Sequence, residues 1–192
     1  MKLLLVRHGE PSYTPCTQRE LKGQGRDLAA LNDDGIHQIL SVSVPKLVDR
    51  GVEIILSSPY TRSLQSAAII ASKLGLITKV VHDLHEWIPD LTFNYSSFKE
   101  LKFIYSDFYE HKGIRKPPVL EPSELHWEEL ETFRNRVENA LKPFCTVYDC
   151  VAVVSHGMVI QSLTGKTVGY GEVVEIEFDE NFVWPQWVFK EP

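Results

Sequence analysis

Residues 2–10 read KLLLVRHGE, an apolar run that ends abruptly on an arginine, a histidine and a glycine. A short, continuous run of leucine and valine predicts a fully buried strand, of the kind found in the middle of a parallel sheet. In open α/β sheets, ligands bind beyond the carboxyl ends of the strands. Arg7 and His8 therefore stand where a functional site is expected.

A second stretch repeats this arrangement late in the chain. Residues 150–154 read CVAVV and are followed by Ser155, His156 and Gly157. If both strands run in the same direction in one sheet, His8 and His156 lie at the same edge. Either histidine alone is most simply a hydrogen-bonded residue at a strand end. The two together, with Arg7 beside one of them, favour a site.

Length and composition predict one soluble globular domain. The chain has 192 residues, of which 43% are hydrophobic and 24% are charged. At about 150 residues per domain, we expect a single domain over residues 1–192. No segment approaches the ~20 apolar residues that span a bilayer, and Met1 leads directly into a strand, so we expect no membrane segment and no signal peptide.

The charge and the cysteines limit the partners and the compartment. A formal charge of −6 argues against nucleic acid as a general partner, because nucleic-acid-binding proteins usually carry a basic surface. An anionic substrate would then need a local cluster of arginines. The 3 cysteines have no regular spacing, which favours reduced thiols in a cytoplasmic protein. The sequence leaves the oligomeric state open.

Hydrophobic periodicity predicts alternating strands and helices after the first strand. Residues 11–32 show little periodicity and are expected to form a long loop over the strand ends. The further elements are a helix over 33–51 with a kink or a break at Pro45, strands at 52–56 and 78–81, helices over 59–74, 127–144 and 158–163, and a terminal hairpin of 173–178 and 183–189.

Two further side chains follow strands of this predicted sheet. Ser58 and Pro59 have the pattern of a helix start, which places Arg62 in the first turn of that helix. A guanidinium at a helix N-terminus is a good setting for an anion. Polar residues also gather after the strand at 78–81, and Glu86 is the carboxyl group that we select there. Outside the context of the histidines and arginines, an exposed loop glutamate would be the simpler interpretation.

Residues 88–125 are rich in aromatic side chains and allow two interpretations. The simpler one is one or two helices packed against the domain, followed by a loop. The alternative is a lid or substrate-facing segment, in which Arg115 or Lys116 would contact a leaving group. The sequence leaves both open.

Common cofactor motifs are absent. Gly165, Lys166 and Thr167 resemble the end of a phosphate-binding loop, but the first glycine of that motif would fall at Ile160. The cysteines are not spaced for zinc, and no second histidine follows His85 at the spacing of a zinc protease. We therefore expect no metal and no cofactor.

Two histidines, two arginines and one carboxyl group suit phosphoryl transfer. Guanidinium groups bind tetrahedral oxyanions through paired hydrogen bonds. A neutral imidazole has an unperturbed pKa of ~6.5 and can attack phosphorus directly. The alkoxide of a phosphate ester leaves poorly, so a protonated carboxyl group such as Glu86 should donate to it and then activate water.

At this point the residues resemble the histidine phosphatase superfamily, in the branch that contains the phosphoglycerate mutases and their phosphatase relatives. Residues 7–10 match its nucleophile motif, residues 57–62 its second phosphate arginine, and residues 155–157 its second histidine. Residues 31–38 and 84–87 resemble the segments that follow the first loop and carry the acid. The match covers roughly residues 1–163 in the right order.

The resemblance implies a three-layer α/β/α fold with a mainly parallel sheet and a phosphohistidine intermediate on His8. It implies a phosphate pocket formed by Arg7, Arg62 and His156, with the Gly157 amide as a further donor, and Glu86 as the proton donor. Thr14 falls where many members place an asparagine that contacts phosphate. The resemblance also implies that no metal is required.

Departures from the mutase pattern favour a phosphatase that acts on a phosphorylated small molecule. Pro11 stands where mutases usually have serine, and the chain lacks their Glu-Arg-His-Tyr-Gly stretch. A phosphoglycerate mutase-type transferase is the first alternative, and a non-catalytic phosphate-binding domain is the second. A binding domain has no use for Glu86 as a proton donor. The identity of the substrate lies beyond the sequence.

Overall fold

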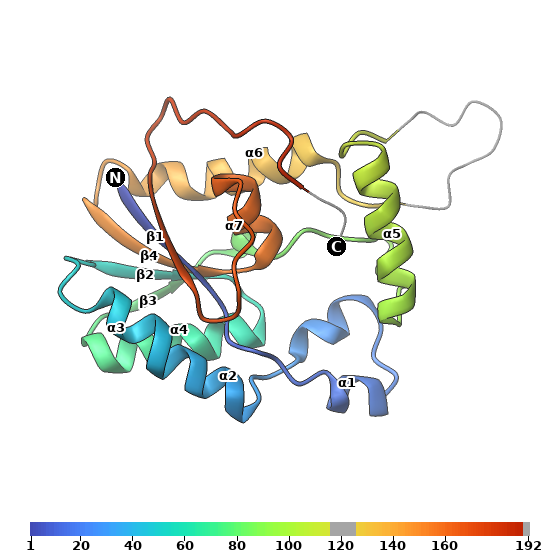
Figure 1. Cartoon of the computed structure of the whole chain (residues 1–192), viewed down its shortest axis with the longest axis horizontal. Coiled ribbons are helices and arrows are strands. Elements are labelled where there is room, and N and C mark those ends of the chain that lie inside the picture. The colour runs from blue at the N-terminus through green and yellow to red at the C-terminus, as the bar shows by residue number, and fades with distance from the viewer. Residues whose placement is uncertain (116–125, 190–192) are drawn as a thin grey trace.

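A 5-stranded sheet forms the centre of the computed structural model, which describes residues 1–115 and 126–189. The strands lie in the order β3-β2-β4-β1-β5, and every neighbouring pair is parallel except β1 and β5 (Figure 1). The mainly parallel sheet predicted from the sequence is confirmed. The strands are β1 (Lys2–Arg7), β2 (Ile54–Ser57), β3 (Thr78–Val80), β4 (Cys150–Ser155) and β5 (Val173–Glu177).

The pairing of the two central strands brings the two histidines to one edge. β1 and β4 pair in parallel from Lys2 with Cys150 to Arg7 with Ser155. His8 and His156 each follow one member of that last pair, and the His8 amide donates a hydrogen bond of 3.0 Å to the Ser155 carbonyl. The expected common edge of the sheet is therefore present.

Helices cover both faces of the sheet, as the three-layer prediction requires (Figure 1). Alternate residues of the central strands point to opposite faces. Leu4 and Val6 pack with the helices of one face, and Leu3 and Leu5 with those of the other. The first face carries α2 (Asp33–Gln38), α3 (Val44–Leu47) and α4 (Thr61–Leu74), and the second carries α6 (Leu130–Leu141) and α7 (Gly157–Thr164).

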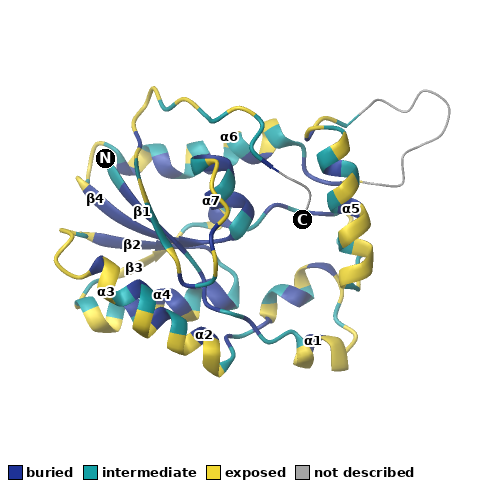
Figure 2. Ribbon diagram, viewed as in Figure 1, coloured by how far each residue is buried: buried dark blue, intermediate teal, exposed yellow. Residues whose placement is uncertain are grey.

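The three inner strands, β2, β4 and β1, are the most deeply buried part of the sheet, whereas β3 at one edge is exposed (Figure 2). Every residue of β2 and β4 is buried, as are the four central residues of β1. Burying a leucine, isoleucine or valine side chain stabilises a fold by about 1.5–3 kcal/mol. Unbroken apolar runs therefore occur where both faces of the sheet are covered.

The helix predicted over 33–51 is present but widens in the middle. Residues Ile39–Ser43 form a π-helical turn between α2 and α3, and the last helical residue is Leu47. Pro45 has no backbone N–H to continue the regular ladder, so the hydrogen-bond spacing changes ahead of it. The predicted kink at Pro45 thus takes the form of a π turn.

This helix packs directly on the backbone that follows His8. A Cβ atom at Gly9 would lie 2.3 Å from the Gly35 carbonyl oxygen, and one at Gly35 would lie 2.2 Å from the Glu10 carbonyl oxygen. The Glu10 amide also donates to Gln38 Oε1 at 2.9 Å. Both glycines are therefore required by the contact between the two segments.

Two predicted segments differ in the structure. Residues 11–32 are not a plain loop, since they include α1 (Thr14–Gln18) and a 3₁₀ turn (Gly23–Leu28). These turns are too short to give a periodic pattern, although Pro15 stands in the first turn of α1, where proline is favoured. Residues 183–189 form no strand; Pro185 cannot donate to a ladder, and this segment packs aromatic side chains against the core on the α6 side.

The segment 88–125 contains α5 (Phe98–Glu110), which lies beyond the carboxyl ends of the strands together with α1 (Figure 1). Residues 116–125, including Lys116, lie outside the described residues. Shorter 3₁₀ turns occur at His82–Leu84 and Lys142–Phe144. None of the helices in the described ranges combines the length and apolar character needed to cross a membrane.

Candidate active site

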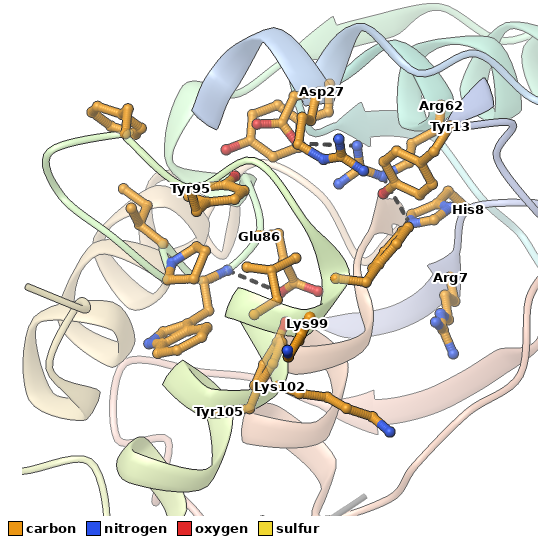
Figure 3. A pocket seen from close by; sticks show the side chains of 18 of the residues that line it. Arg7, His8, Tyr13, Asp27, Arg62, Glu86, Tyr95, Lys99, Lys102 and Tyr105 are labelled. Carbon is orange, nitrogen blue, oxygen red and sulfur yellow. Dashed lines mark hydrogen bonds and ion pairs between the residues drawn. The ribbon is translucent and has the colours of Figure 1, made fainter. Parts of the chain in front are cut away.

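A cavity of about 620 Å³ opens at the carboxyl ends of the strands. Arg7, His8, Arg62 and Glu86 all line it, and Figure 3 shows their side chains around one space. His156 is fully buried beside them, with its ring centre 5.0 Å from that of His8. The structure thus brings together the five polar side chains selected from the sequence.

His8 is held in one orientation and one tautomer. Its Nδ1 lies 2.7 Å from the Gly9 carbonyl oxygen, which only accepts hydrogen bonds, so Nδ1 carries the proton and Nε2 keeps its lone pair. Nε2 accepts a hydrogen bond of 3.1 Å from Arg62 Nε. Burial, reinforced by the positive charge of Arg62, lowers the pKa of His8 well below its usual value. The ring is therefore a neutral imidazole with a nucleophilic nitrogen facing Arg62.

Arg62 is the centre of the hydrogen-bond network. It is the second residue of α4 and only 4% exposed. Besides His8, its guanidinium contacts Asp27, through an ion pair of 3.1 Å to Oδ1, and His156, with 3.4 Å between Nη2 and Nδ1. The planar fork of donors thus fixes three side chains from different parts of the chain.

His156 is bonded on both sides of its ring. Arg62 has only donors, so Nδ1 of His156 accepts and Nε2 carries the proton, which it donates to Ser58 Oγ at 2.7 Å. Burial and the charge of Arg62 lower the pKa of His156 well below its usual value. Ser58 is not the N-cap that the sequence predicts, since α4 starts at Thr61; its hydroxyl accepts from His156 and, at 3.3 Å, from the Tyr60 amide just before the helix.

Arg7 lies at the end of β1 and turns its side chain along the cavity wall. Its Nη1 donates a hydrogen bond of 2.6 Å to the Val168 carbonyl, and its guanidinium carbon lies 4.2 Å above the centre of the Tyr170 ring. Arg7 Nε is buried without a hydrogen-bond partner among the described residues. Because Arg7 lines the cavity, its guanidinium can also contact an anion bound there.

Glu86 faces the cavity across from His8 (Figure 3). Its carboxylate accepts hydrogen bonds from the Trp87 amide at 2.9 Å and the Met158 amide at 3.2 Å. Burial raises the pKa of Glu86, although these two hydrogen bonds and the charges of Arg62 and Arg7 act in the opposite direction. A carboxyl group in such a place can keep its proton at a higher pH than an exposed glutamate.

The segment that carries Glu86 is held in place by a buried ion pair between Arg136 and Glu128. Arg136 donates to the carbonyls of Asp83, His85 and Glu86 at 2.7–3.0 Å and forms an ion pair with Glu128 at 2.6 Å. The Trp87 ring is 1% exposed and donates to the Glu128 carbonyl. The position of the carboxyl group therefore depends on residues of, and just before, α6.

Three residues of the predicted phosphate pocket do not line the cavity: His156, which is buried beside it, Thr14 and Gly157. Thr14 begins α1 and is exposed, whereas the adjacent Tyr13 turns its ring into the cavity. Gly157 begins α7, and a Cβ there would lie 3.6 Å from the guanidinium carbon of Arg7, which is an ordinary contact. The available space does not require glycine at this position. Gly157 is the first residue of the 8-residue helix α7.

The sequence interpretation missed several cavity residues. Asp27 pairs with Arg62, and burial raises its pKa although Arg62 opposes that effect. The ring of Tyr60 lies 5.1 Å from that of His156, and the ring of Tyr170 lies 5.6 Å from that of His8. A single aspartate or tyrosine in a segment without periodicity carries no local signal. These residues reach the site only through contacts between segments that are distant in the sequence, which the folded structure shows.

One group of described residues could hold a metal ion. Ligand atoms of His82, Asp83 and His85 lie within 4.8 Å of one another. His85 Nδ1 lies 2.8 Å from the Glu86 carbonyl, which leaves Nε2 as its ligand atom. None of the three lines the cavity described above. This group therefore has no part in the proposed chemistry, and the absence of a metal requirement stays a prediction.

Comparison with known proteins identifies the family of the chain. The model of the histidine phosphatase superfamily (branch 1) matches residues 3–175. The chain belongs to this superfamily. Phosphoglycerate mutase-like protein 4 from Arabidopsis thaliana is 28% identical over 166 residues, which are 84% of this chain and 69% of the relative.

Solved histidine phosphatase structures share the fold at low sequence identity. The alpha-ribazole phosphatase from Shigella flexneri has a TM-score of 0.68 and 20% identity, covering 97% of this chain and 95% of its own. YhfR from Bacillus stearothermophilus has a TM-score of 0.68 and 18% identity, covering 96% of this chain and 94% of its own. Mycobacterial glucosyl-3-phosphoglycerate phosphatase in complex with VO3 has a TM-score of 0.66 and 17% identity, covering 92% of this chain and 92% of its own. At these identities the similarity establishes the fold alone.

Proposed function

We propose that this protein is a metal-independent phosphomonoesterase that acts on a phosphorylated small molecule through a phosphohistidine on His8. The observation that carries the proposal is the fixed tautomer of His8, whose unprotonated Nε2 lies 3.1 Å from Arg62 Nε in a cavity that also exposes Glu86. The superfamily includes phosphatases, and two of the structural relatives named above are phosphatases.

In the first step, the Nε2 lone pair of His8 attacks phosphorus and the bond to the ester oxygen breaks. The phosphoryl oxygens take over the hydrogen bond that Arg62 Nε gives to Nε2, and the guanidinium of Arg7, which also lines the cavity, binds the same oxygens. Glu86 gives its proton to the leaving oxygen, so the alcohol leaves neutral. The phosphoryl group stays on His8 as a phosphoramidate.

In the second step, Glu86 has become a carboxylate and removes a proton from the attacking water. The oxygen of the water bonds to phosphorus, the bond to Nε2 breaks, and inorganic phosphate leaves. The protonation state of His156 depends on the charge of the phosphoryl group bound beside it. A nearby dianion opposes the effects that lower the pKa of His156 and favours the imidazolium, which can donate from Nδ1.

A mutase-type transferase is the second candidate, since the curated relative is a phosphoglycerate mutase-like protein. In a mutase, the phosphoryl group on His8 passes back to a second position of the sugar acid instead of to water. Such an activity depends on a bisphosphorylated primer, whereas hydrolysis does not. Adding the primer to an assay with a phosphorylated sugar acid separates the two.

The test is to trap the phosphoenzyme with chelator present. The protein is mixed with an aryl phosphate and quenched in base, because a phosphohistidine is stable in base and labile in acid. We expect the added mass of one phosphoryl group on the peptide that contains His8. His37→Ala, a change of an exposed histidine on α2, should label normally. Acid-stable label, or label that persists in His8→Ala, would contradict the proposal.

A further inference from the structure

The cavity is far larger than a phosphoryl group. A volume of about 620 Å³ falls in the range of pockets that enclose drug-sized ligands. Arg7, His8, Arg62 and Glu86 occupy one part of its surface. Much of the rest is an aromatic wall formed within residues 87–105, and its members include Trp87, Ile88, Phe93, Tyr95, Leu101 and Tyr105.

The aromatic wall is fastened to the opposite side of the cavity. Arg26 is 4% exposed and donates to the Ser96 carbonyl at 3.0 Å. Its guanidinium carbon also lies 5.4 Å from the centre of the Tyr13 ring and 5.2 Å from that of Phe98. The Gly23 amide donates a hydrogen bond of 2.9 Å to the Tyr95 carbonyl. The cavity is therefore closed by contacts between two segments that are far apart in the sequence.

Two lysines stand at the rim of this wall. Lys99 and Lys102 are one turn apart on α5, are exposed, and line the cavity. In Figure 3 they lie on the side of the cavity away from Asp27 and Arg62. The chain carries a formal charge of −6, so a pair of lysines at one cavity does not reflect an overall basic composition.

The other cations of the cavity already have partners. Arg62 is paired with Asp27, Arg26 is bonded to a carbonyl, and Arg7 is bonded to the Val168 carbonyl and stacked on a ring. In the parts of the chain that the structure describes, neither Lys99 nor Lys102 has a carboxylate within 4.0 Å. The rim thus presents two positive charges that no described side chain neutralises.

We propose that Lys99 and Lys102 bind a second anionic group of the substrate, at the end of a leaving group whose apolar or aromatic body packs against the aromatic wall. The inference rests on the proposed function and adds the class of substrate to it. The class is a phosphomonoester with an extended apolar leaving group that ends in a carboxylate, sulfonate or phosphate. A small leaving group would contact neither the aromatic wall nor the two lysines at its rim.

Matched aryl phosphates test the charge separately from the chemistry. One pair has phenyl leaving groups, with a 2-carboxyethyl or a propyl substituent opposite the phosphate, and the spacer keeps the reactivity of the two phenols similar. A second pair has biphenyl leaving groups with the same two substituents, to cover a longer reach. The variant Lys99→Gln/Lys102→Gln removes both charges from exposed helix positions where glutamine is also a good helix former.

In at least one pair, we expect the double variant to raise KM for the carboxylate probe about fivefold while KM for its neutral partner changes less than about twofold. Lys46→Gln/Lys73→Gln removes two exposed charges from α3 and α4 and serves as the control for overall charge. It should leave the preference between probes unchanged.

The outcomes separate the inference from the proposed function. Turnover of the neutral probes with no charge preference at either length, or an equal loss on both probes of each pair, overturns the inference and leaves the phosphatase standing. A shift of the preference in the control variant would assign the effect to overall charge and would also overturn it. No turnover of any probe by the unmodified protein would overturn the phosphatase proposal and this inference with it.

Discussion

The two ends of the cavity are built in different ways. The histidine end, formed by Arg7, His8, Arg62, Glu86 and His156, follows directly from strand ends, and its histidines are at most 5% exposed. The aromatic wall lies outside the sheet, on α5 and the segment before it, and carries exposed lysines at its rim. The parallel strands position the histidine end, and contacts between connecting segments position the aromatic wall.

This difference separates chemistry from the choice of substrate. At the histidine end, each ring has hydrogen bonds that set its tautomer, so a change there alters the reacting atoms themselves. At the aromatic wall, the side chains can touch only the part of the substrate that does not react. Substitutions at the first should change kcat, and substitutions at the second should change KM.

The largest effect is expected at His8. His8→Ala removes the attacking nitrogen, and we expect kcat on an aryl phosphate to fall by about 10⁴-fold or more, as for other covalent nucleophiles. Steady-state kinetics give the loss, and a thermal melt shows whether the variant is folded. His8→Gln fills more of the space and should be equally inactive. Activity above about one-hundredth of the original in both folded variants would place the nucleophile elsewhere.

Glu86→Gln should have the next largest effect, and the loss should depend on the leaving group. We expect kcat to fall about 10²- to 10³-fold with an alkyl phosphate, which needs a proton, and much less with a nitrophenyl phosphate. Equal losses on both substrates would mean that Glu86 is not the acid.

The pH profile of the unmodified protein tests the same residue. Because the pKa of Glu86 is raised, its protonated form persists above the usual range, and kcat/KM on the alkyl phosphate should fall as the pH rises through that raised value. On the acid side, the lowered pKa of His8 keeps the ring neutral below pH 6.5, so activity should be lost only as the pH falls further. In Glu86→Gln the alkaline fall should disappear.

A smaller effect is expected at Asp27, at the border of the histidine end. Asp27→Asn keeps an acceptor for Arg62 but removes the negative charge. We expect kcat to fall about tenfold, because Arg62 is held less firmly against His8. Inhibition by inorganic phosphate should become about twofold tighter, since a carboxylate that repels the anion is gone. Weaker inhibition together with lower kcat would assign Asp27 a role in binding instead.

The smallest effect is expected at Arg26, which fastens the aromatic wall. Arg26→Gln removes the guanidinium that bonds to the Ser96 carbonyl, and we expect KM for a biphenyl phosphate to rise about threefold while kcat on phenyl phosphate stays within about twofold. Arg19→Gln, an exposed change on the same connecting segment, is the control. A fall in kcat on both substrates would show that the wall and the histidine end are coupled.

The histidine end could be predicted because its residues stand beside strong local signals. The runs before His8 and before His156 are apolar without interruption, and such runs predict buried parallel strands. Once two strands share a sheet, the residues after them share an edge. Arg62 and Glu86 follow β2 and β3 in the same way, so the sheet places four segments together without further information.

The sequence left the aromatic wall as one of two interpretations of residues 88–125, because the position of this segment depends on contacts with distant parts of the chain. Nothing near Asp27 or Lys99 indicates that they line the same cavity, and Thr14 was chosen where Tyr13 faces inward. Ser58 shows the same limit on a smaller scale. A serine before a proline has the pattern of a helix cap, but a buried histidine that needs an acceptor has the stronger requirement.

The contact between Gly9 and Gly35 has a consequence for how this sequence can change. Most packed pairs can exchange volume, since one side chain can shrink when the other grows. Here each residue is already the smallest that exists, and backbone fills the space that a Cβ would need, that of Gly35 at position 9 and that of Glu10 at position 35. No substitution at one position can be compensated at the other. The junction behind the nucleophile is thus a fixed point around which the rest of the chain has to vary.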